Sequence, residues 1–181
     1  MTILRETTND KHRQIEQLPM IKNMFEGKFT TEMYLHYLYE LKHIYRTLED
    51  LASKQGLFND MPDIKRYHHI CRDIEELGGY PGRPLTYATE NYIRYLNTLY
   101  NTQPEMIMAH VYVRHMGDLY GGKLMAKVLP GPGYMYQFED KNAIIKTFNS
   151  LLTPDLGPEA NRGFDHFINI FTELWDTIIC K

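Results

Sequence analysis

Apolar residues recur at steps of three and four along several stretches of this chain. The clearest stretch runs from Thr31 to Lys54, where one face collects Tyr34, Tyr37, Leu38, Leu41, Ile44, Tyr45, Leu48 and Leu51. This spacing predicts an amphipathic helix, because one helical turn takes 3.6 residues. Strand-type alternation, internal repeats and low-complexity segments are absent from the pattern. The sequence therefore predicts an all-α fold.

Glycine and proline separate the remaining helical segments. Helices are predicted at Pro62 to Leu77, Tyr87 to Tyr100, Asp140 to Leu151 and Pro158 to Ile179. A longer helix begins after Pro104 and reaches about Val128, before the run Pro-Gly-Pro-Gly that follows it.

Length and composition narrow the class of protein. A chain of 181 residues, 43% of them hydrophobic, suits a single domain spanning residues 1–181. The formal charge of −3 gives no reason to expect nucleic acid as a partner. No apolar run approaches 18 residues, and the N-terminus has no signal-type apolar segment. Two distant cysteines, Cys71 and Cys180, suit a reducing compartment. We expect a soluble, cytoplasmic monomer with no membrane contact.

Three glycines interrupt the predicted helix after Pro104. Gly117, Gly121 and Gly122 together cost about 3 kcal/mol relative to alanine in a helix interior. A helix without Cβ atoms on one side can lie directly against a flat, bulky partner. Arg114 and Asp118, four residues apart, share a face beside these glycines. An alternative interpretation ends the helix at Gly117 and places the later glycines in a loop.

The same run resembles the distal-helix signature of the haem (heme) oxygenase family. That signature has the form R-x-x-G-D-x-x-G-G, with an aromatic residue two positions earlier. It is matched here by Tyr112, Arg114, Gly117, Asp118, Gly121 and Gly122. Near the N-terminus, His12 and Glu16 resemble the family's proximal-helix segment. The resemblance implies an all-α heme oxygenase fold, with heme between a proximal helix bearing His12 and a kinked, glycine-rich distal helix.

The resemblance also implies roles for individual residues. His12 would be the metal ligand that holds the heme iron, with Glu16 as its partner. The implied catalytic residues are Asp118, Arg114, Gly117 and Tyr45. Those implied to bind the cofactor are His12, Glu16, Arg5, Tyr112, Gly121, Gly122, Lys141, Lys146 and Phe164. From periodicity alone, Tyr45 is equally well explained as a core aromatic residue.

One position departs from the family pattern. In many members, an asparagine near the middle of the last helix joins the distal polar network. Phe167 stands at the equivalent position, and Asn169, two residues away, would face elsewhere. This difference changes the expected water network more than the expected reaction.

The reaction implied by the resemblance is oxidative cleavage of heme at the α-meso carbon. Heme is both cofactor and substrate, dioxygen is the oxidant, and the products are biliverdin IXα, carbon monoxide and iron. Electrons would come from a reductase or an acidic ferredoxin, because no G-x-G-x-x-G motif follows a strand. Lys123 and Lys127 could form part of the docking patch for that donor. A bilin reductase would be a downstream partner.

Three other classes of protein share parts of this pattern. A di-iron carboxylate bundle needs two Glu-x-x-His pairs, and only Glu40 with His43 supplies one. A thiaminase-like protein needs a cysteine nucleophile, and neither cysteine lies near the glycine-rich run. A non-catalytic heme carrier would also use a histidine ligand and a close-fitting pocket. Asp118 separates the carrier from the oxygenase, because a carrier has no evident need for a carboxylate over the open iron face.

Overall fold

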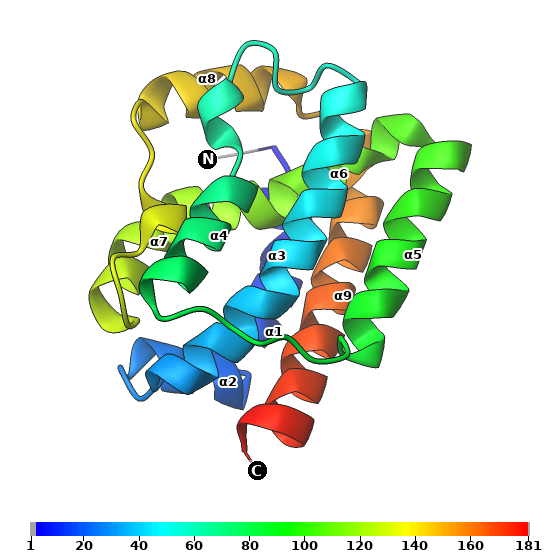
Figure 1. Ribbon diagram of the computed structural model, residues 1–181. Coiled ribbons are helices and arrows are strands. Elements are labelled where there is room, and N and C mark those ends of the chain that lie inside the picture. The colour runs from blue at the N-terminus through cyan, green and yellow to red at the C-terminus, as the bar shows by residue number, and fades with distance from the viewer. Residues whose placement is uncertain (1–2, 181) are drawn as a thin grey trace.

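The computed structural model describes residues 3–180, which form helices joined by turns and short loops (Figure 1). The α-helices are α1 (Arg5–Glu16), α2 (Pro19–Phe25), α3 (Thr31–Lys54), α4 (Tyr67–Glu76), α5 (Tyr87–Thr102), α6 (Ile107–Val111), α7 (Gly117–Val128), α8 (Lys141–Leu151) and α9 (Gly157–Leu174). Helices α3, α5 and α9 run along one another, and α1 packs on α9. Within the described residues there is no strand, and the predicted all-α fold is confirmed.

The long central helix α3 forms where the apolar stripe predicted it. Every residue of that stripe is buried, including Tyr45 at 0% exposure. The helix begins at a capping residue, because the Thr30 hydroxyl accepts a hydrogen bond from the Met33 amide at 3.2 Å. No helix among residues 3–180 has both the length and the apolar character needed to cross a bilayer.

Two local predictions were wrong or incomplete. The segment from Pro62 to Leu77 is not one helix, because a 3-10 turn at Pro62–Ile64 is separated from α4 by extended backbone at Lys65. The buried guanidinium of Arg66 holds this break open by donating to the backbone carbonyls of Ile64 and Gln137, at 3.1 and 2.5 Å. Helix α2 was missed because seven residues are too few to display a helical period.

The glycine-interrupted segment is helical from Ile107 to Val128, so the alternative interpretation, with a loop at Gly121 and Gly122, was wrong. It is not a uniform α-helix. A π-helical turn at Tyr112–Met116 joins α6 to α7 immediately before Gly117. Such a turn inserts extra backbone into the ladder of hydrogen bonds and is a recognised cause of kinks. The kinked helix α6–α7 is called the distal helix below.

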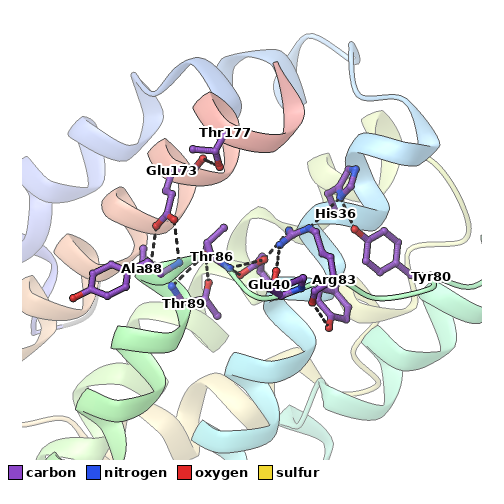
Figure 2. Close-up of polar contacts among 12 residues, drawn as sticks. His36, Glu40, Tyr80, Arg83, Thr86, Ala88, Thr89, Glu173 and Thr177 are labelled. Atoms are coloured by element: carbon purple, nitrogen blue, oxygen red, sulfur yellow. Dashed lines mark hydrogen bonds and ion pairs between the residues drawn. The ribbon is translucent and has the colours of Figure 1, made fainter. Parts of the chain in front are cut away.

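A buried polar cluster ties α3 to the connection that leads into α5 (Figure 2). Glu40, fully buried on α3, lies 2.6 Å from the Arg83 guanidinium and accepts a 3.0 Å hydrogen bond from the Thr86 hydroxyl. Glu173 on α9 accepts from the amides of Tyr87 and Ala88 at the start of α5. Glu40 therefore serves a structural ion pair, and the di-iron alternative loses its one Glu-x-x-His pair.

Candidate functional site

A cavity of about 720 Å³ opens between α1 and α2 on one side and the distal helix on the other. This volume lies within the range of small-molecule sites. Its lining is mostly apolar and aromatic, with Phe164, Phe167 and Phe171 contributed by α9. The polar side chains that reach it include His12 and Glu16 from one wall and Arg114 and Asp118 from the other. Segments that are distant in sequence thus meet around one pocket.

His12 stands on the α1 wall, which is called the proximal wall below. Its Nδ1 lies 3.2 Å from Glu16 Oε1, one helical turn later. The His12 ring meets the edge of the Phe164 ring, with centroids 6.2 Å apart. Side-chain exposure of 46% for His12 reflects the open cavity in front of it. Because Glu16 engages Nδ1, the imidazole is oriented with Nε2 as the nitrogen that remains for a ligand.

The opposite, distal wall is bare backbone at two of the three glycines. A Cβ added to Gly117 or Gly121 would meet no atom within 4 Å, and both residues line the cavity. A Cβ on Gly122 would instead lie 3.0 Å from Cβ and Cδ1 of Tyr136. Two glycines therefore keep the cavity clear, while Gly122 allows the turn that carries Tyr136 to pack against the helix.

Arg114, Asp118 and Tyr45 form one buried polar cluster, called the distal cluster. The Tyr45 hydroxyl donates a short hydrogen bond to Asp118 Oδ2. Arg114 Nε donates to the Tyr45 oxygen at 3.2 Å, and its Nη2 lies 3.5 Å from Asp118 Oδ1. The predicted shared face of Arg114 and Asp118 is confirmed. Tyr45, which sequence periodicity left ambiguous, contacts both.

Burial raises the proton affinity of the two acidic groups of this cluster. It raises the pKa of Asp118 above its ordinary value, although the positive charge of Arg114 and the Tyr45 hydrogen bond act in the opposite direction. Burial likewise raises the pKa of the Tyr45 phenol well above its ordinary value. Asp118 thus takes up a proton more readily than a carboxyl on the surface does.

A sequence model of the heme oxygenase family matches residues 1–149. The chain belongs to the heme oxygenase family. It is 28% identical to bovine heme oxygenase 1 over 134 aligned positions, covering 69% of this chain and 46% of that protein. It is 25% identical to rabbit heme oxygenase 2 over 203 aligned positions, covering 95% of this chain and 65% of that protein. The chain thus spans about half the length of the first of these relatives.

Solved structures of heme oxygenases share the fold. Heme oxygenase-1 of Synechocystis, solved in complex with heme, superposes with a TM-score of 0.86 at 22% identity, covering 97% of this chain and 92% of that one. The Leptospira interrogans heme oxygenase superposes with a TM-score of 0.84 at 24% identity, covering 94% of this chain and 97% of that one.

Phe167 is the residue that the sequence resemblance placed where many family members have an asparagine. The Arg114 guanidinium carbon lies 4.2 Å from the centroid of the Phe167 ring. A cation over an aromatic face is attracted by the ring quadrupole. This family member therefore supports Arg114 with a ring face where an amide was expected. Asn169 is exposed and does not line the cavity, in keeping with the expectation that it faces elsewhere.

The structure divides the expected propionate-binding residues into two groups. Arg5 and Tyr112 line the cavity, and the Tyr112 hydroxyl is 3.5 Å from that of Thr8. Lys141 and Lys146 do not line it. The Lys141 ammonium donates to the Leu119 carbonyl at 3.0 Å, and Lys146 is exposed on α8. The sequence alone could not show which of these four residues reach the cavity. The position of α8 depends on the irregular backbone between Val128 and Lys141, which has no periodic pattern.

Sequence reasoning missed three phenols that line the cavity of this heme oxygenase family member, Tyr37, Tyr120 and Tyr136. Tyr37 lies on the buried stripe of α3 two turns before Tyr45, so periodicity assigned it to the core. Tyr136 lies in a 3-10 turn after α7, where no periodic signal exists. Only the packing of this turn against Gly122 brings Tyr136 to the cavity.

Proposed function

We propose that this protein cleaves heme oxidatively at the α-meso carbon, giving biliverdin IXα, carbon monoxide and iron, with dioxygen and externally supplied electrons. One observation carries the proposal. A single apolar cavity has an oriented histidine on one wall and, on the other, bare glycine backbone next to a buried carboxyl, guanidinium and phenol. The family membership and the fold support the same function.

The residues present fit a heme group. A flat, largely apolar ring system needs apolar walls and close approach on both faces, and the cavity supplies both. His12 Nε2 offers the neutral imidazole nitrogen that commonly binds heme iron. On the opposite face, the space in front of Gly117 and Gly121 is clear of side chains. Phe164, beside His12, would pack against the ring system.

When bound, heme supplies both the iron that activates dioxygen and the carbon that is oxidised. The distal wall would limit the space above the iron, because the helix backbone at Gly117 and Gly121 forms that wall. Asp118 would hold and deliver protons at its carboxyl oxygens. Arg114 and Tyr45 would keep that carboxyl in place through the contacts described above.

The regiochemistry depends on how the ring is rotated in its plane. Heme carries two propionates, which cations and phenol donors bind well. Arg5 and Tyr112, both at the cavity, are the side chains we propose for this role. Lys141 and Lys146 do not line the cavity and would act only after a rearrangement of α8.

Electrons must reach the site from a partner. The sequence contains no dinucleotide-binding motif, so a ferredoxin or a reductase is proposed as the donor. Lys123 and Lys127 are exposed on α7, next to the cavity residues Leu124 and Met125. They could contact an acidic donor, and a bilin reductase could take up the product.

The test is a single-turnover assay. Purified protein is mixed with hemin, given a ferredoxin and its reductase under air, and followed by absorbance and by chromatography of the pigments. We expect loss of the heme bands, formation of the α isomer of biliverdin, and release of one carbon monoxide per heme. A non-catalytic heme carrier would instead bind hemin through His12 and keep it intact. Intact heme under all donors tested would favour the carrier.

A further inference from the structure

The buried histidine beside the distal cluster has no role in the function proposed above. His115 lies in the π-helical turn of the distal helix, three residues before Asp118, and is 0% exposed. Its ring packs on the Tyr45 ring, with centroids 5.1 Å apart, and on Phe58 at 5.7 Å. It does not line the heme-sized cavity, so it would not touch the substrate.

Glu49 determines which nitrogen of His115 carries the proton. Its Oε1 lies 3.0 Å from His115 Nε2 and also accepts the Arg66 amide at 2.5 Å. The Tyr67 amide, at the start of α4, donates to the same carboxyl at 3.2 Å. A carboxylate that accepts several N–H groups needs a donor from the imidazole, so Nε2 carries hydrogen.

The second ring nitrogen of His115, Nδ1, makes no hydrogen bond to the described residues. His115 Nδ1 is buried and has no hydrogen-bond partner among residues 3–180. Buried polar atoms are nearly always paired, and an unpaired one calls for an explanation. In the neutral ring Nδ1 is an open proton acceptor, and after protonation the adjacent Glu49 stabilises the imidazolium.

The charges around this histidine come from three elements. Glu49 and the Tyr45 phenol approach from α3, Arg66 from the turn before α4, and Asp118 and Arg114 from the distal helix itself. A positive charge on His115 opposes the rise that burial imposes on the pKa of Asp118. The charge state of His115 therefore acts on the Asp118 carboxyl.

We propose that His115, held by Glu49, is a positioning residue of the distal cluster: it packs Tyr45 toward Asp118, and its Nδ1 takes up a proton that places positive charge beside the Asp118 carboxyl. This inference rests on the proposed heme oxygenase function only for its catalytic consequence. Protonation adds one proton at the Nδ1 lone pair and breaks no other bond.

The test compares two substitutions with a matched control. His115→Gln can still donate to Glu49 from its amide but cannot titrate, and Glu49→Gln keeps an acceptor but removes the charge that stabilises the imidazolium. His110→Gln is the control. His110 is another fully buried histidine, 2.9 Å from Glu159 through Nε2, but its Nδ1 is paired with the Tyr92 hydroxyl.

The first readout is the titration of Asp118 itself, in heme-free protein labelled with ¹³C at the aspartate carboxyls. Carbon NMR against pH gives the midpoint, and Asp118→Asn identifies the signal. We expect His115→Gln to raise the Asp118 midpoint by about one pH unit, because a nearby cation no longer opposes protonation. Glu49→Gln should give a smaller rise, because the lost negative charge partly offsets the lost imidazolium. His110→Gln should leave it within about 0.2 unit.

The second readout is the pH profile of heme degradation, whose acid limb should shift in the same direction. The heme-free titration stands even if the wild-type protein fails to degrade heme, so the two proposals can fail separately. Unchanged Asp118 midpoints in both His115→Gln and Glu49→Gln would overturn the inference, and so would an equal shift in His110→Gln. If His115→Gln does not fold, His115→Asn, which also cannot titrate, takes its place in the comparison.

Discussion

Adjacent glycines on the distal helix should respond to alanine in opposite ways. At Gly121 a methyl group would meet no atom within 4 Å, so the substitution should gain the helix propensity of alanine, about 1 kcal/mol. At Gly122 the same methyl would lie 3.0 Å from Cβ and Cδ1 of Tyr136 and 3.4 Å from its Cα. Tyr136 is buried, so its backbone turn must move, and overpacking of this kind costs about 1–3 kcal/mol.

The free energies of unfolding of the two heme-free variants should therefore differ by about 1–3 kcal/mol, because the propensity gain is common to both and only Gly122→Ala carries the overpacking cost. Urea denaturation followed by circular dichroism measures this. With a slope of about 2 kcal/mol per molar urea, the midpoint of Gly121→Ala should rise by about 0.5 M, and that of Gly122→Ala should fall.

Heme binding should reverse the order of the two variants. The methyl of Gly121→Ala enters the cavity where the ring system would lie, so hemin affinity should fall by about tenfold or more, as for one misplaced methyl group in a fitted pocket. Gly122→Ala, facing Tyr136, should lose stability more than affinity. A Gly121→Ala protein that is more stable and also binds hemin as tightly as the parent would refute the argument that these glycines exist for close approach.

Three further outcomes are expected. His12→Ala should remove the imidazole-ligated hemin spectrum, which added imidazole should partly restore; a spectrum equal to that of the parent would mean that another residue binds the iron. Asp118→Ala should bind hemin normally but lose most biliverdin formation, with Asp118→Asn intermediate, as measured by bilin yield; full yield from the alanine variant would remove Asp118 from the mechanism. Burial lowers the pKa of His166 to about 4, so the unfolded chain takes up its proton first and stability is lost as pH falls from about 6.5 toward 4. His166→Phe should keep the stack on Tyr92 and flatten the stability profile in that window, as measured by urea denaturation at several pH values; an unchanged slope would contradict this assignment.

The sequence alone determined the features that depend on local periodicity. The stripe on α3 predicted that helix with its bounds, because burying one face of a helix leaves a pattern of three- and four-residue steps. The spacing of four residues between Arg114 and Asp118 also predicted that they share a face, since four residues make about one turn. The loss of helix propensity at three glycines of the distal helix predicted that its backbone lies close to a bulky partner.

Tertiary structure decided what each of those residues faces. Glycines one residue apart, Gly121 and Gly122, look alike in sequence, yet one borders the cavity and the other packs on Tyr136. The helix predicted from Pro62 to Leu77 is interrupted at Arg66, whose buried guanidinium donates to the Gln137 carbonyl, about 70 residues later in the chain. Lys141, expected to bind a propionate, donates a hydrogen bond to the Leu119 carbonyl instead. His115 on the distal helix is hydrogen-bonded to Glu49 on α3. Long-range partners of this kind leave no periodic trace in the chain, because they are selected by packing between elements and not by the spacing within one.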